Sequence, residues 1–165
     1  FEGFTIDGSL SYLDFQYTAV DTAATGVQLD DVTPYTPKWK WSIGAQYTVP
    51  NVAGGNVVLR VDGAYQSKIY GQAENEETRV VPTAGAGGGP LANVTVTDRI
   101  DGYFLGNARV TWMSGDDKWA VGLEVQNITD KYYFTTILEE SVSAGVASRA
   151  PGLPRTWAVS VKRKF

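Results

Sequence analysis

The sequence ends in Arg155-Thr156-Trp157-Ala158-Val159-Ser160-Val161-Lys162-Arg163-Lys164-Phe165. Apolar and polar residues alternate along this stretch, and successive side chains of a β-strand point to opposite faces. One face would carry Trp157, Val159, Val161, Arg163 and Phe165. The other would carry Thr156, Ala158, Ser160, Lys162 and Lys164. One mostly apolar face and one hydrophilic face are typical of a terminal strand in a membrane β-barrel.

Five earlier segments show the same alternation, whereas helical periodicity is sustained nowhere. They lie at about residues 4–12, 38–49, 57–66, 103–112 and 119–126. After Tyr12 the apolar phase slips by one residue to Leu13, Phe15 and Tyr17. Such a slip indicates either a β-bulge or a strand that leaves the region where its two faces must differ. The sequence therefore predicts an all-β chain with six strands.

The connections between these segments alternate in length. Residues 50–55 and 114–118 are short connections, and residues 20–37, 71–100 and 129–153 are long ones. Outer-membrane barrels combine short periplasmic turns with long extracellular loops. We therefore predict an antiparallel up-and-down meander with both chain ends on the periplasmic side. A strand of about 12 residues, tilted by about 40°, would rise roughly 30 Å and cross the apolar band.

Composition excludes several classes of function. With zero cysteine and zero histidine among 165 residues, a disulfide framework, a thiol nucleophile, a Ser-His-Asp triad and a histidine metal cluster are ruled out. A net charge of −4, with 14 Lys and Arg spread along the chain, argues against a nucleic-acid partner. The sequence contains no run of 18 apolar residues, so it predicts no transmembrane helix. We expect no enzyme activity, no cofactor and no metal site.

Alternation alone leaves open whether the apolar face lines a core, as in a soluble lipocalin-like barrel, or contacts lipid. The aromatic residues favour lipid, because they fall in two bands at opposite strand ends, as interfacial girdles do. The band near the short turns holds Tyr47, Trp112, Trp119 and Phe165, and the band near the long loops holds Trp39, Tyr65 and Trp157. Arg163, the charged residue of the apolar phase, lies near the periplasmic end, where a long side chain can snorkel.

Two motifs resemble those of the TonB-dependent outer-membrane receptors. Residues 125–133, Val-Gln-Asn-Ile-Thr-Asp-Lys-Tyr-Tyr, resemble the family signature N-[LI]-T-D-K-x-Y that follows the penultimate strand. Residues 154–157, Pro-Arg-Thr-Trp, resemble its last strand, and residues 103–109 resemble an earlier one. Arg163 stands where the family usually has an aromatic residue, and Ser160 where it usually has glycine.

The resemblance implies the carboxy-terminal part of a barrel of about 22 strands in the outer membrane of a Gram-negative bacterium. Residues 1–165 would be one barrel segment, and the abrupt start at Phe1 is expected of a piece of a longer polypeptide that also contains an amino-terminal plug domain. The implied function is uptake of a scarce large solute, such as an iron-siderophore, cobalamin or glycan. The implied partners are membrane lipid, the plug, the TonB energy-coupling complex and the barrel-assembly machinery, which would bind the last strand.

Two groups of residues are candidates for function. Arg60, Asp62, Arg109 and Glu124 lie mid-strand on the polar face, facing the lumen. They would either contact the plug or the solute path, or pair across neighbouring strands and hydrate the wall, and we favour pairing. Tyr132, Tyr133 and Phe134, with the 71–100 segment, would either capture the ligand outside the cell or mark the outer membrane interface.

Two other protein classes stay open at this stage. One is a smaller porin-like barrel in the same membrane. The other is a soluble β-barrel or sandwich that binds an apolar ligand. Six strands are too few to close a membrane barrel, for which about eight is the smallest bacterial number.

Overall fold

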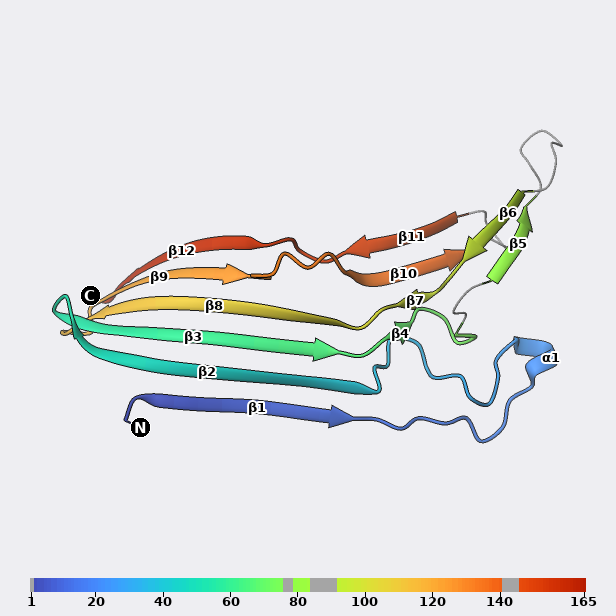
Figure 1. Cartoon of the computed structure of the whole chain (residues 1–165), viewed down its shortest axis with the longest axis horizontal. Helices are drawn as coiled ribbons and strands as arrows, with labels where there is room; N and C mark the ends of the chain where they lie inside the picture. Colours follow the sequence, from blue (N-terminus) through green and yellow to red (C-terminus); the bar gives the residue numbers. More distant parts are fainter. Residues whose placement is uncertain (1, 76–78, 84–91, 141–145) are drawn as a thin grey trace.

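The computed structural model describes residues 2–75, 79–83, 92–140 and 146–165, with the backbone alone described at 79–83 and 92–96. In this part of the chain, one antiparallel sheet contains six strands in the order β1-β2-β3-β8-β9-β12 (Figure 1). Their bounds are β1 Phe4–Tyr12, β2 Trp39–Val52, β3 Gly55–Gln66, β8 Tyr103–Ser114, β9 Trp119–Gln126 and β12 Thr156–Arg163. The predicted six-stranded meander is therefore confirmed, and both termini lie at the same end of the sheet (Figure 1).

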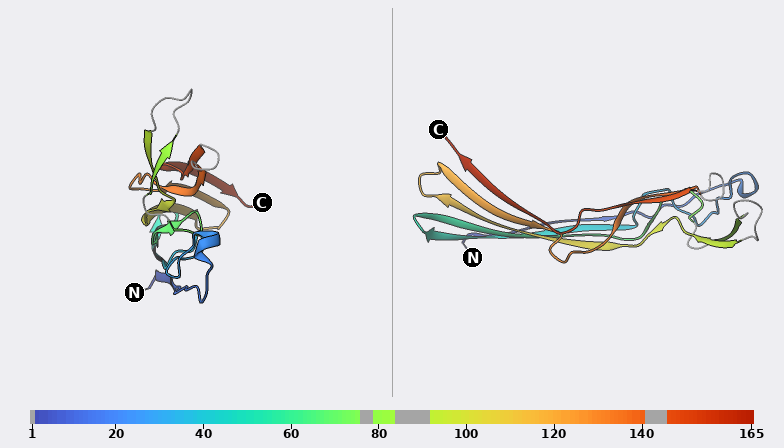
Figure 2. Two further views of the ribbon diagram at one scale, coloured as in Figure 1. Left: turned by 90° about the vertical axis from the view of Figure 1, so that its right-hand side faces the viewer. Right: turned by 90° about the horizontal axis from the view of Figure 1, so that it is seen from above.

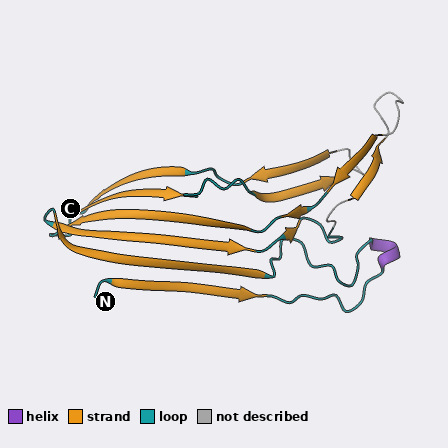
Figure 3. Ribbon diagram, viewed as in Figure 1, coloured by secondary structure: helices purple, strands orange, loops and turns teal. Residues whose placement is uncertain are grey.

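The long connections contain secondary structure that the sequence did not predict. Three small antiparallel sheets of two strands each lie in these connections. They pair β4 (Ile69–Tyr70) with β7 (Arg99–Ile100), β5 (Arg79–Thr83) with β6 (Ala92–Val96), and β10 (Phe134–Glu140) with β11 (Val146–Pro151). They lie with the short helix α1 (Thr22–Thr25) at the end opposite the termini, the outer end (Figure 3). No helix in the described ranges has the length and apolar character needed to cross a membrane.

The two short turns are built differently. The turn predicted at residues 50–55 is shorter in the structure, because β2 continues to Val52, which pairs with Gly55 across Ala53 and Gly54. Both turn residues have positive φ angles, 50° and 74°, as the tightest β-hairpin turns require. The turn after β8 lies where predicted, and Asp116 accepts hydrogen bonds there from the Ser114 hydroxyl and the Lys118 amide. These bonds lower the pKa of Asp116 below its ordinary value.

The apolar face of the sheet is open. Val61, Val110 and Leu123 are 56%, 45% and 46% exposed, and they do not converge on a dry centre. Seen from above, the long strands form a single layer (Figure 2). A soluble sandwich would bury these side chains against a second sheet, and no second sheet covers them in the described residues. In the described residues the apolar face is therefore not packed as the soluble sandwich alternative requires.

The phase slip after Tyr12 marks the end of a strand. β1 pairs with β2 in unbroken register and stops at Tyr12, after which one more backbone bond joins the Leu13 amide to the Lys38 carbonyl. A β-bulge, the other possibility, is not present in this pair.

The buried apolar cluster of the described chain lies beyond the sheet, among the outer hairpins. Ile69, Ile100 and Ile137 are each at most 5% exposed, and partly buried Tyr103 and Phe134 pack against them. Tyr35, in the first long connection, joins this cluster through its hydroxyl group. The hydroxyl donates to the Ile137 carbonyl at 2.7 Å and accepts from the Ile137 amide at 3.3 Å. The outer segments are thus packed against one another.

Removing the Tyr35 hydroxyl should loosen this packing. In a Tyr35→Phe variant of the complete protein, the loss of a net hydrogen-bond contribution of about 1 kcal/mol should speed hydrogen exchange at the Ile137 amide roughly fivefold. Mass spectrometry of deuterium uptake in the β10 peptide measures this. Tyr132→Phe is the matched control, because Tyr132 is 70% exposed and should leave exchange unchanged. Equal exchange in both variants would contradict the role of Tyr35.

Candidate functional site

The polar face of the sheet carries a charged cluster centred on Arg60 of β3. Its guanidinium lies 3.0 Å from an oxygen of Asp7 on β1 and 2.7 Å from an oxygen of Asp62 on β3. Strand β2, which lies between β1 and β3, contributes Gly44, the register partner of both Asp7 and Asp62. A Cβ atom at Gly44 would lie only 2.5 Å from Arg60 Nη2. The absence of a side chain therefore lets one arginine connect β1 with β3 across β2.

A second ion pair continues the cluster along the sheet. Arg109 of β8 is the register partner of Glu124 on β9, and its Nε donates to that carboxylate at 2.9 Å. The second Glu124 oxygen accepts from the Gln126 amide at 2.9 Å. A hollow of about 280 Å³ lies between the two ion pairs and is lined by Arg60, Asp62, Asn107, Ala108, Arg109 and Glu124.

The register explains why these charges are paired. Arg60 and Arg109 are directly opposite each other on β3 and β8, and like charges in that position are destabilising. Each guanidinium is turned toward carboxylates of other residues, which compensates the repulsion. The four predicted residues line one hollow. Arg109 and Glu124 pair across neighbouring strands, whereas Arg60 pairs with Asp62 on its own strand and with Asp7 two strands away. Contact with a plug or a solute stays a prediction.

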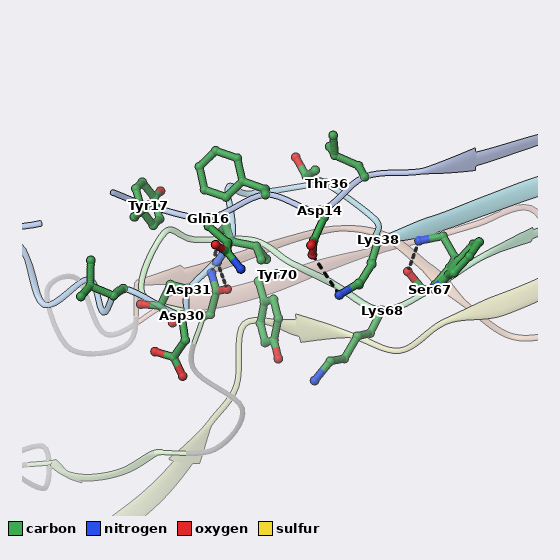
Figure 4. A pocket seen from close by; sticks show the side chains of 16 residues that line it. Asp14, Gln16, Tyr17, Asp30, Asp31, Thr36, Lys38, Ser67, Lys68 and Tyr70 are labelled. Carbon is green, nitrogen blue, oxygen red and sulfur yellow. Dashed lines mark hydrogen bonds and ion pairs between the residues drawn. The ribbon is translucent and has the colours of Figure 1, made fainter. Parts of the chain in front are cut away.

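A larger pocket of about 790 Å³ lies at the outer end of the sheet (Figure 4). The first long connection supplies one wall, and the segment that follows β3 supplies the other. Its lining comprises Leu13, Asp14, Phe15, Gln16, Tyr17, Leu29, Asp30, Asp31, Val32, Thr36, Lys38, Trp39, Ser67, Lys68, Tyr70 and Asn75. Ligand pockets typically have volumes of about 300–1,000 Å³ and combine apolar walls with a few polar groups, so this pocket has the size and character of a ligand site.

Two lysines provide the positive charge of the pocket. Lys38 Nζ lies 3.1 Å from an oxygen of Asp14 (Figure 4) and 5.5 Å from the ring centre of Tyr12. The hydrogen bond to Asp14 raises the pKa of Lys38 above its ordinary value of 10.5, so Lys38 is cationic throughout the physiological range. Lys68 Nζ lies 5.3 Å from the centre of the Tyr70 ring. Both ammonium groups are thus placed beside aromatic rings, which orients them.

The three aromatic residues predicted to capture a ligand differ in their surroundings. Tyr132 is 70% exposed. Tyr133 packs on Tyr103, with ring centres 4.5 Å apart, and Phe134 packs on the buried isoleucine cluster. Tyr132 is therefore the member of this group that an external ligand could reach most readily. A role in ligand capture stays a prediction for all three.

The aromatic residues predicted at the membrane interfaces occupy the two ends of the sheet. Near the long loops Trp39 contacts Tyr12, and Tyr65 stacks on Trp41 at 5.8 Å. Near the short turns, the rings of Trp119 on β9 and of Phe165 both contact the guanidinium of Arg163. Tyr47 is opposite Phe4 at that end, Trp112 precedes the β8–β9 turn, and Trp157 lies one residue into β12. These residues lie toward the two ends of the sheet, and their assignment to membrane interfaces stays a prediction.

Sequence reasoning did not find the outer pocket, nor the roles of Asp7 and Gly44. The phase slip at residues 13–17 was the available signal for the pocket, because it places the apolar Leu13, Phe15 and Tyr17 outside the apolar phase of the sheet, and all three line the pocket. No sequence signal singles out Gly44, whose function depends on the register of three strands. Among the described residues, no group of three or more Asp or Glu side chains is placed to hold a metal ion.

No protein-family model matches the sequence. Solved structures do match over the whole chain. The ferric yersiniabactin uptake receptor of Yersinia pestis matches 99% of this chain with a TM-score of 0.73 and 13% identity, over 21% of its own length. The ferric-catecholate import receptor of E. coli matches 100% with a TM-score of 0.68 and 16% identity, over 19% of its length. The sheet has the fold of a section of a TonB-dependent receptor barrel.

A third receptor agrees with this assignment. The ferric preacinetobactin receptor of Acinetobacter baumannii matches 100% of the chain with a TM-score of 0.65 and 21% identity, over 20% of its own length. The chain therefore spans about a fifth of the length of the solved receptors that it matches. At these identities the likeness concerns the fold.

A side chain at Gly44 should disrupt the charged cluster of this barrel section. We expect Gly44→Ala to lower the free energy of unfolding of the complete barrel by about 1–3 kcal/mol, because the new methyl group overlaps the Arg60 guanidinium. Chemical unfolding in detergent, followed by circular dichroism, measures this. In an Arg60→Ala background the same substitution should cost less than half as much, since the guanidinium is absent and no longer holds the Asp7 and Asp62 carboxylates 2.8 and 2.9 Å from the new Cβ position. Equal costs in both backgrounds would show that Arg60 does not make Gly44 necessary.

Proposed function

We propose that this chain is a section of the wall of an outer-membrane active transporter that takes up a scarce large solute, the most favoured class being a ferric chelate. The observation that carries the proposal is the match of the whole chain to barrel sections of receptors for ferric siderophores. The exposed apolar face of the sheet and the charged cluster on its polar face support it, because a barrel wall separates lipid from a hydrated lumen.

The sheet needs further strands for this function. β1 and β12 are its outermost strands, and unpaired backbone groups at a sheet edge are not tolerated in hydrocarbon. We infer that strands elsewhere in the protein pair with both edges and close a barrel, with a total of about 22 strands as in the receptor family. The chain covers about a fifth of each matched receptor, which favours this large barrel over the smaller porin-like alternative.

Ferric chelates are favoured over cobalamin and glycans for two reasons. The matched proteins are receptors for ferric yersiniabactin, ferric catecholates, ferric preacinetobactin and, in a fourth case, an iron-bound pyoverdine. The outer pocket combines aromatic rings with two lysines and three aspartates, so it offers both ring contacts and polar groups to a large chelate. Lys38 and Lys68 would contact the anionic groups of such a solute.

The remaining parts of the proposal concern partners. An amino-terminal plug would fill the lumen and contact the polar face near Arg60 and Arg109. The TonB complex of the inner membrane would supply energy through that plug, and the barrel-assembly machinery would bind β12. The chain would lie in the outer membrane of a Gram-negative bacterium and carry no catalytic centre, since its part is to form a wall.

Uptake by whole cells tests the proposed function. A strain that lacks the complete gene should lose energy-dependent uptake of one ferric chelate from a panel of radiolabelled ferric siderophores, cobalamin and glycans. The complete gene on a plasmid should restore uptake, and an uncoupler of the inner-membrane proton gradient should abolish it. Normal uptake of the entire panel by the deletion strain would contradict the proposal. If the uptake that depends on the gene is insensitive to the uncoupler, the porin-like barrel is favoured.

Neutralising the pocket lysines tests the outer pocket as the capture site. We expect Lys38→Ala combined with Lys68→Ala to weaken binding of the transported chelate about tenfold, because each exposed cation contributes on the order of 0.5–1 kcal/mol to attraction of an anionic ligand. Fluorescence quenching on the purified complete transporter measures the affinity. The control is Lys162→Ala, which removes a positive charge at the opposite end of the sheet. Equal affinities in all variants would exclude the pocket from capture.

A further inference from the structure

Arg163 is a cation on the apolar face of the sheet. It lies in the same phase of β12 as Val159 and Val161, and it is the register partner of Trp119 on β9. Its guanidinium carbon lies 5.0 Å from the centre of the Trp119 ring and 4.8 Å from the centre of the Phe165 ring. The two rings orient the guanidinium plane, as cation–π contacts do.

The N–H groups of Arg163 have no carboxylate to bind within the described residues. No ion pair or side-chain hydrogen bond to Arg163 is formed by any described group, although a guanidinium offers five N–H donors in a planar fork. The fork matches the geometry of phosphate oxygens, which accept two parallel N–H bonds. Arg163 therefore presents a preoriented anion-binding group on the face that the proposed function assigns to lipid.

Further positive charge lies at the same end of the sheet, although Lys162 and Lys164 alternate to the opposite face of β12 from Arg163. The backbone amide of Lys164 donates a hydrogen bond of 2.8 Å to the backbone carbonyl of Lys118, in the β8–β9 turn. Lys162 and Lys164 line a hollow of about 160 Å³ together with Lys118 and Asp117. Asp116, the other nearby carboxylate, is engaged by the Ser114 hydroxyl and the Lys118 amide. Four cations and two carboxylates thus leave the short-turn end of β9 and β12 net positive, in a chain whose net charge is −4.

We propose that Arg163 binds the phosphate headgroup of an anionic phospholipid at the short-turn end of the barrel. This inference rests on the proposed function for the position of the sheet in a membrane. Lipid is favoured over free phosphate because the guanidinium lies on the apolar face, among interfacial aromatic rings, where acyl chains can pack on Val159 and Val161 while the phosphate reaches the N–H groups. The site would select anionic over zwitterionic lipid by its net positive charge.

Brominated lipids test the proposal, because bromine quenches a tryptophan that it contacts. The complete barrel, purified in detergent, is titrated with brominated phosphatidylglycerol or with brominated phosphatidylcholine. We expect phosphatidylglycerol to quench the Trp119 emission, taken as the difference between the barrel and a Trp119→Phe variant, at the lower concentration. Arg163→Gln should raise the phosphatidylglycerol concentration needed for half-quenching about fivefold, since one interfacial cation contributes on the order of 1 kcal/mol to binding of anionic lipid. The phosphatidylcholine titration should not change.

Two further variants complete the experiment. Lys118→Gln, which lies outside the last strand and so leaves assembly through β12 intact, should give a smaller shift in the same direction. Lys40→Gln removes the same charge from the polar face at the outer end, and it should have no effect. Equal quenching by both lipids in the unaltered protein, or an equal shift from Lys40→Gln, would overturn the proposal.

Two other outcomes are distinguishable from these. If millimolar inorganic phosphate abolishes the preference for phosphatidylglycerol, the site binds free phosphate, and the lipid assignment is wrong. If neither brominated lipid quenches while uptake of a ferric chelate is intact, the lipid-facing position of Trp119 is wrong and the lipid site is overturned without the transport function. If both quenching and uptake are absent, the proposed function itself fails.

Discussion

The ladder of backbone hydrogen bonds between neighbouring strands is the interaction on which the rest of this structure depends. The sheet is one layer thick, so no core between layers holds its long strands together. Each strand is fixed by its neighbours, in a register that runs almost unbroken from β1 to β12. Because side chains alternate between faces along such a ladder, the register also decides which residues share a surface. Every other feature of the sheet follows from that division.

On the polar face, the consequence is a network of charges that crosses strands. Arg60 and Arg109 are opposite each other, and the network is stable because Asp7, Asp62 and Glu124 lie within reach of them. Gly44 illustrates how closely backbone and charge are coupled. Its position in β2 has no direct electrostatic role, and yet a side chain there would separate Arg60 from its partners. The charges on this polar face are thus stabilised by pairing with one another.

On the apolar face, small residues and aromatic rings take complementary positions. Gly63 of β3 is covered by the ring of Phe104 on β8, whose atoms would lie 2.8 Å from a Cβ at that glycine. Ring and glycine thus fit together on the apolar face, toward the ends of β3 and β8 that lie near the long loops. At the outer end the chain changes character, since there the buried isoleucines and Tyr35 bring three connections together. The sheet forms a wall and the outer segments form a small packed structure of their own.

The amino-acid sequence by itself determined the six strands, their antiparallel order and the two kinds of face, because these depend on a period of two residues that is legible along the chain. It also identified Arg60, Asp62, Arg109 and Glu124 as charges on one face, and the two bands of aromatic residues. It could not determine the outer hairpins, whose strands are short and interrupted by Pro82, Pro151 and an irregular register near Phe134. Only the tertiary structure decided that Asp7 and Gly44 complete the charged cluster, that Tyr133 is packed while Tyr132 is exposed, and that the residues after Tyr12 line a pocket. These features depend on distances between segments far apart in the chain, which the alternation of neighbouring residues does not encode.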